Sequence, residues 1–289
     1  AIAARAAELV TTARETEVAE RVKAIELIDT RKAAEQAAIT IKVAAEAERQ
    51  KGRPFEKIAA FAKWLASNNE HSRLLSVLPP EQAIRDGGLF LSYVAAMEHM
   101  GRWKALRELI RKNPSIPIPP AITSLILARC AHFLKEPSEL VRSHLQEGLQ
   151  RAAVVKDRAT MMTIGNTADE FGHPDIAMEA FTLLASQPTL RLSMLERMIQ
   201  LRQRQRDLPA MIDLIDLCLK EQPKNPGYVE AWCYLKLLEG SEMEKAADTI
   251  RRLVEADPGR VPTAALVQAF AAYRFGDLET AGREANSVV

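Results

Sequence analysis

The chain has 289 residues, and 47% of them are apolar, which is enough to bury a large core and excludes global disorder. Its 39 basic and 38 acidic side chains nearly cancel, so no basic excess points to a nucleic-acid partner. The longest uncharged stretch, Asn113 to Ala128, has 16 residues and is interrupted by prolines. A membrane-spanning helix needs about 20 apolar residues. The sequence therefore predicts no transmembrane segment and favours a cytoplasmic protein, with peripheral association to a membrane left open.

Residues 1–50 differ in composition from the rest of the chain. They contain fifteen alanines and no glycine, proline, cysteine, histidine or aromatic residue. Such a segment has high helix propensity and no internal stop signal, so we expect one long helix over residues 1–52. Val18, Val22 and Ile25 form an apolar stripe that would allow a coiled coil. Gly52 and Pro54 end this helix and place a domain boundary before residue 55.

Four stretches of this segment resemble the long Ala/Glu-rich helix of bacterial flotillins: Arg14–Arg21, Ala24–Ile28, Arg31–Glu35 and Ile41–Glu48. In that family the helix follows a membrane-associated domain and takes part in oligomeric assembly. The resemblance implies a homo-oligomer formed through residues 1–50. The chain begins on Ala1 rather than Met and stops inside a helical pattern at Val289, so we expect it to be a piece of a longer protein.

Beyond residue 55, turn signals recur at gaps of 33 to 36 residues. This period is typical of stacked helix pairs, in which no single pair can bury its apolar face alone. Three prolines, Pro188, Pro223 and Pro258, repeat at 35 residues in parallel with the turns. The turn signals are Asn68, Gly101, Glu136, Gly172, Arg206, Ser241 and Gly276.

One repeat is clearest between Gly165 and Pro188. Small residues at Gly165 and Ala177 would let two helices approach closely, and Phe181 would fill the space beside them. These offsets resemble the tetratricopeptide repeat (TPR). The resemblance covers residues 55–289 and implies an all-α fold, a right-handed α-solenoid of about seven helix hairpins. Pentatricopeptide repeats have a similar pitch and bind RNA, but the basic groove and end motif that they would need are not in the sequence.

The sequence contains no recognisable catalytic or metal-binding motif. The five histidines are scattered, and we find no H-E-x-x-H, no P-loop, no G-x-G-x-x-G and no G-x-S-x-G. We therefore predict no enzyme activity, no metal and no cofactor. Cys130, Cys218 and Cys233 are odd in number and lack C-x-x-C spacing, which favours buried thiols over disulfides.

In TPR proteins the first helix of each pair lines a concave groove, and the resemblance implies which residues would face it. Most of the side chains predicted to face the groove carry hydrogen-bond acceptors, and Asp169 and Glu196 give this set of residues a net negative charge. A ligand with Lys, Arg or amide donors would suit them. A chaperone-tail clamp would need lysines at these positions, and they are lacking. The predicted partner-binding residues are Asn166, Asp169, Glu196, Gln200, Gln203, Phe270 and Tyr273.

The sequence thus predicts a non-catalytic scaffold that binds a peptide or helix of a partner protein in the groove. One alternative is a structural assembly element that oligomerises through the N-terminal helix. An RNA-binding helical-repeat protein is the less favoured alternative.

Overall fold

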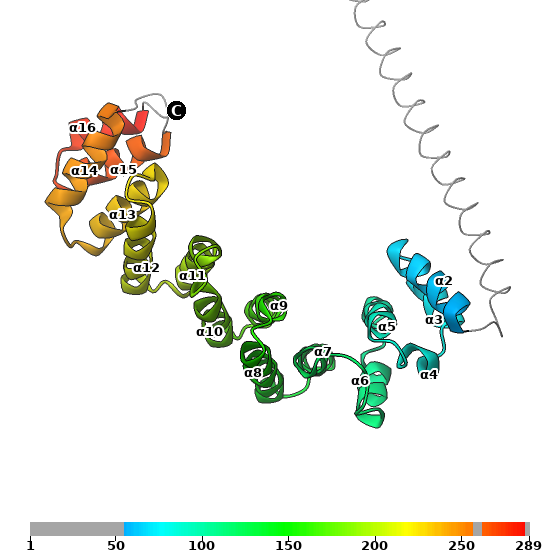
Figure 1. Ribbon diagram of the computed structural model, residues 1–289. Helices are drawn as coiled ribbons and strands as arrows, with labels where there is room; N and C mark the ends of the chain where they lie inside the picture. The colour runs from blue at the N-terminus through cyan, green and yellow to red at the C-terminus, as the bar shows by residue number, and fades with distance from the viewer. Residues whose placement is uncertain (1–54, 257–261, 287–289) are drawn as a thin grey trace, which may run out of the picture. The chain divides into compact units, whose positions relative to one another are not determined.

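The computed structural model describes residues 55–256 and 262–286 (Figure 1). The described residues form fifteen helices and no strand, which confirms the all-α prediction. The long helix, the coiled coil and the boundary before residue 55 concern residues outside the described range and stay predictions. The helices are α2 (Phe55–Ser67), α3 (His71–Val77), α4 (Pro80–Ala83), α5 (Gly87–His99), α6 (Trp103–Lys112), α7 (Pro120–Phe133), α8 (Ser138–Val154), α9 (Arg158–Glu170), α10 (Pro174–Ala185), α11 (Arg191–Gln205), α12 (Leu208–Glu221), α13 (Pro226–Glu239), α14 (Met243–Ala256), α15 (Pro262–Arg274) and α16 (Leu278–Asn286).

The chain divides into two compact units, residues 1–118 and 119–289. In the first unit, α2 packs on α3, and α5 packs on α2, α3 and α6. Leu65, Leu74 and Phe90 are fully buried there. The start of α5 passes so close to the loop after α6 that a Cβ on Gly87 would lie 2.2 Å from the carbonyl oxygen of Pro117. Only glycine fits at this position.

The second unit consists of five consecutive helix hairpins, from α7/α8 to α15/α16 (Figure 1). We call the first helix of each hairpin its A-helix and the second its B-helix. Each B-helix also packs on the A-helix of the next hairpin. Apolar side chains form one buried cluster over α7–α11 and another over α12–α15. Neighbouring hairpins therefore share their cores, as expected for a solenoid.

All seven predicted turn signals lie between the two helices of a hairpin, which confirms the seven hairpins. Each of these turns holds a residue with positive φ, which reverses the chain after the A-helix. Gly101, Gly172 and Gly276 supply it where the sequence shows a glycine, and Arg206 supplies it at a φ of 57°. Near Glu136 it is the preceding residue, Lys135, that has positive φ.

Gly165 on α9 and Phe181 on α10 pack as the repeat motif predicts. A Cβ on Gly165 would lie 2.8 Å from Cε1 of Phe181 and 3.0 Å from Cβ of Ala180. Phe181 is only 1% exposed. The missing side chain at 165 is therefore what lets the two helices approach.

The thiols of Cys130, Cys218 and Cys233 are buried and none is in a disulfide, as predicted. Burial raises the pKa of the Cys218 thiol to about 11 and that of Cys233 to about 12. Such thiols are protonated and unreactive at neutral pH. Within the described ranges, no helix is long and apolar enough to cross a membrane.

Candidate partner-binding surface

The predicted binding residues lie on three A-helices of the second unit. Asn166 and Asp169 are on α9, Glu196, Gln200 and Gln203 on α11, and Phe270 and Tyr273 on α15. We call the exposed faces of α9, α11, α13 and α15 the A-helix surface.

Side chains on α9 and α11 are joined across one repeat. Nη2 of Arg204 lies 2.6 and 2.7 Å from the two carboxylate oxygens of Asp169. Nη1 of Arg197 donates to Oδ1 of Asn166 at 3.3 Å. Both contacts lie on the exposed side of the helices, where no backbone hydrogen bond joins the repeats. They join the two A-helices at this surface, in addition to the packing of both helices on α10.

The next contact joins α11 to α13. The Tyr228 hydroxyl donates to Oε1 of Glu196 at 2.7 Å. Burial, and then this bond to a carboxylate, raises the pKa of Tyr228 well above its ordinary value of 10.0. The tyrosine is therefore held as a neutral donor throughout the physiological pH range.

Gln200 and Gln203 project from α11 beside these pairs. Both side chains are exposed, and neither amide forms a hydrogen bond with another described residue. Each amide offers one acceptor and two N–H donors. Both amides are therefore available to a ligand.

The A-helix surface becomes apolar between α13 and α15. Tyr273 is 61% exposed, whereas Phe270 is partly buried because its ring packs 5.7 Å from that of Tyr234 on α13. The guanidinium of Arg274 lies 6.0 Å from the Phe270 ring, and its Nη1 donates to the backbone oxygen of Leu238 at 3.4 Å.

Sequence reasoning missed the arginines of this surface. The TPR offsets selected one position per helical turn and passed over Arg197 and Arg204, which lie one place after a selected residue. Arg204 pairs with Asp169, and Arg197 bonds Asn166. These two positive charges on the exposed side of α11 offset the net negative charge that was expected from Asp169 and Glu196. One signal was available, since Arg204 follows Asp169 by 35 residues, a single repeat.

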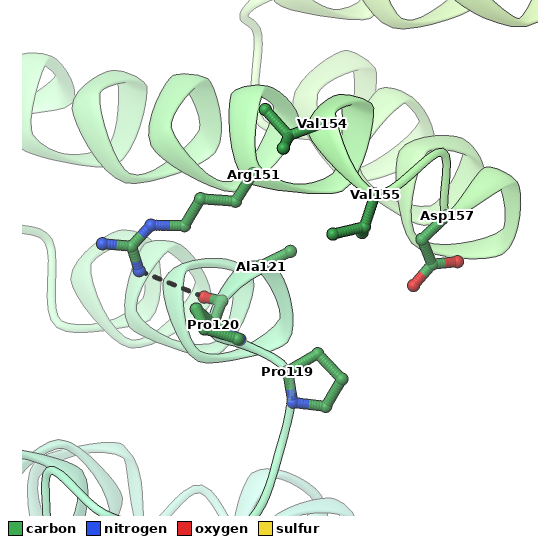
Figure 2. A pocket seen from close by; sticks show the side chains of 7 residues that line it. All are labelled: Pro119, Pro120, Ala121, Arg151, Val154, Val155 and Asp157. Atoms are coloured by element: carbon green, nitrogen blue, oxygen red, sulfur yellow. Dashed lines mark hydrogen bonds between the residues drawn. The ribbon is translucent and has the colours of Figure 1, made fainter.

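A pocket of about 600 Å³ lies elsewhere in the second unit, at the start of α7 and the end of α8 (Figure 2). Its walls are mainly apolar, with Val154 83% and Val155 69% exposed. Nη1 of Arg151 donates to the backbone oxygen of Pro120 at 3.4 Å, and Nη2 pairs with Glu147 at 2.6 Å. The lining residues are Pro119, Pro120, Ala121, Arg151, Val154, Val155 and Asp157.

Asp157, the only acid in this lining, caps α9. Its carboxylate accepts from the Thr160 hydroxyl at 2.6 Å and from the Thr160 backbone N–H at 3.1 Å. These bonds lower the pKa of Asp157. Because Arg151 and Asp157 both support the fold, the pocket offers apolar surface and no free acid or base.

Among residues 55–256 and 262–286, no cluster of three or more His, Cys, Asp or Glu side chains could hold a metal ion. No protein-family model matches the chain, and no curated protein matches its sequence. The comparisons give no support to the flotillin resemblance of residues 1–50.

Several solved structures resemble the chain at low sequence identity. One is the C-terminal part of a TPR repeat-containing protein from Cytophaga hutchinsonii, with 14% identity, a TM-score of 0.45 and coverage of 68% of this chain and 76% of that one. PilW, a type IV pilus biogenesis factor, has 13% identity, a TM-score of 0.38 and coverage of 68% and 88%. MamA has 14% identity, a TM-score of 0.41 and coverage of 58% and 90%. The fold class itself rests on the hairpins described above, which form a TPR-like α-solenoid.

Proposed function

We propose that this chain is a non-catalytic scaffold that binds a linear segment of a partner protein on the A-helix surface of α9, α11, α13 and α15. The observation that carries the proposal is the pair of exposed amides of Gln200 and Gln203, which form no hydrogen bond with another described residue. Asn166, Asp169 and Glu196 beside them are already paired across repeats. A peptide backbone needs both donors and acceptors when it leaves water. Glutamine amides supply both.

The pairs Asp169–Arg204 and Glu196–Tyr228 support this proposal by holding the binding residues in place before a ligand arrives. A surface that is ordered in advance loses less conformational entropy on binding. The apolar pocket at α7 and α8 supports a non-catalytic role in another way, because both of its charged groups are engaged in the fold.

The test is a selection from a displayed library of random 16-residue peptides against the full chain. The affinity of the most strongly retained peptide is then measured by fluorescence anisotropy. Replacing Gln200 and Gln203 together by Ala should weaken binding about tenfold, since each lost hydrogen bond contributes about 0.5–1.5 kcal/mol. Gln150→Ala, an exposed glutamine on the B-helix α8, is the matched control.

Retention of no peptide above a blank support would contradict the proposed function. So would a retained peptide whose affinity is unaffected by substitutions anywhere on the A-helix surface.

A further inference from the structure

Four large apolar side chains are exposed together on α13 and α15. Tyr234 is 43%, Leu238 44%, Leu266 47% and Tyr273 61% exposed. We call these four residues the apolar strip. By contrast, every exposed residue on α11 is polar or charged.

The apolar strip is continuous across the two helices. Residues four apart on a helix lie on one face, so Tyr234 and Leu238 align on α13, and Leu266 aligns with Phe270 on α15. The two helices pack on each other, and the rings of Tyr234 and Phe270 meet between them. Exposed apolar residues that are scattered singly need no explanation, whereas a contiguous patch marks an interaction site.

A fixed positive charge borders the apolar strip. Arg274 is exposed, and its guanidinium is held by the backbone oxygen of Leu238 and by the face of Phe270. No carboxylate of a described residue pairs with it, and a guanidinium with five N–H donors retains several for a ligand. Arg274 continues the stripe on α15, four residues after Phe270.

We infer that the apolar strip binds an acidic, apolar segment of a partner protein. Aliphatic or aromatic side chains of the segment pack on Tyr234, Leu238, Leu266 and Tyr273, and a carboxylate close to them in the segment pairs with Arg274. The charge of Arg274 selects the occupant, because a basic segment would meet repulsion at the border of the strip. This inference rests on the proposed function and specifies the chemistry of its ligand.

The same peptide library tests the inference through the sequences that it yields. Retained peptides should combine two aliphatic or aromatic residues, spaced three or four apart, with an Asp or Glu close by. Arg274→Glu should weaken the binding of the most strongly retained peptide at least tenfold. Replacing the acidic residue of that peptide by Lys should restore binding to the Arg274→Glu chain.

Matched substitutions on B-helices provide the controls. Lys220→Glu on α12 reverses an exposed charge away from the strip, and Leu183→Ser on α10 removes a leucine that is 40% exposed. Both controls should stay within twofold of the unmodified affinity, whereas Leu266→Ser should weaken binding. Tyr273→Ser replaces Leu266→Ser if circular dichroism shows that the latter has lost its helical fold.

Retained peptides that are basic, or that bind Arg274→Glu unchanged, would overturn the inference. If such peptides still lost affinity when Gln200 and Gln203 were substituted, the proposed function would stand and only the inference about the apolar strip would fail. Sedimentation velocity gives a second readout. A dimer of the unmodified chain that Leu266→Ser dissociates would assign the strip to a second copy and would also overturn the inference.

Discussion

Arg204 on α11 places one guanidinium nitrogen, Nη2, within 2.7 Å of both carboxylate oxygens of Asp169 on α9. The two residues are 35 positions apart and occupy the faces of adjacent A-helices. Their contact joins two repeats whose main packing runs through the B-helix α10. The surface proposed to bind a partner therefore also carries a contact between neighbouring hairpins.

The Asp169–Arg204 pair should contribute only modestly to stability. Because the Arg204 side chain is 61% and that of Asp169 27% exposed, water and salt screen the attraction. A double-mutant cycle with Asp169→Ala and Arg204→Ala, followed by urea unfolding, should give a coupling of about 0.2–1 kcal/mol that falls as salt is raised. A coupling well above this range that does not change with salt would show that the pair is screened less than its exposure indicates.

Gly165→Ala should destabilise the chain by about 1–3 kcal/mol, because the new methyl group would overlap Phe181 and Ala180. Gly282→Ala on α16 is the matched control. Nothing lies within 4 Å of a Cβ at residue 282, so helix propensity alone should make this change neutral or stabilising. Phe181→Leu added to Gly165→Ala should recover part of the loss. Equal melting temperatures for Gly165→Ala and the unmodified chain would contradict the close approach of α9 and α10.

The hairpin turns offer a reciprocal pair of substitutions. Gly172 has a φ of 79° with open space around it, and Arg206 occupies the equivalent turn with a φ of 57°. The left-handed conformation costs a residue with a Cβ about 1–2 kcal/mol. Gly172→Ala should therefore lower the free energy of unfolding by about 1 kcal/mol, and Arg206→Gly should raise it by a smaller amount. Chemical denaturation measures both changes. If the two substitutions changed the free energy of unfolding in the same direction, the two turns would not share this geometry.

Asp157 should make stability depend on acidic pH. Its folded pKa lies below the ordinary value of 3.8 because Thr160 hydrogen-bonds the carboxylate. The carboxylate therefore contributes stability above about pH 4, and that contribution is lost as pH falls from 4 through the lowered folded pKa.

Two substitutions isolate this contribution. Asp157→Asn should flatten the pH dependence below 4, and Asp157→Ala should cost about 1 kcal/mol at pH 7 through loss of the helix cap. Thr160→Val, which replaces the hydroxyl by a methyl group, should flatten the pH dependence of stability in part. Thermal unfolding from pH 2 to 7 measures how stability depends on pH. If Asp157→Asn lost stability below pH 4 as the unmodified chain does, the titration of Asp157 would not be the cause.

The repeat period predicted the fold well because glycines and prolines report local backbone geometry. Gly172 and Gly276 mark turns directly, and even Arg206, with no glycine signal, was found from spacing alone. Three turns were placed one residue away from the residue with positive φ. That residue is Asn69 rather than Asn68 in the first turn and Lys135 rather than Glu136 in the third. In the sixth turn Gly240 and Glu242, on either side of Ser241, have positive φ. Spacing fixes the length of a repeat but does not fix which residue takes the left-handed conformation.

The candidate site was harder to predict. The TPR offsets identified side chains such as Gln200 and Gln203 that are exposed on an A-helix. They could not reveal that Arg204 neutralises Asp169, or that Arg274 borders exposed apolar residues on α13. Those contacts depend on how successive hairpins stack, which no local sequence signal specifies.

Hydrogen–deuterium exchange of the full chain tests the central claim most directly. It is measured with and without saturating amounts of the 16-residue peptide retained most strongly from the random library. If the A-helix surface is the binding site, exchange should slow in α11, α13 and α15 and stay unchanged in the B-helices α10, α12 and α14. Slowed exchange confined to the B-helices, with the A-helices unchanged, would contradict the account.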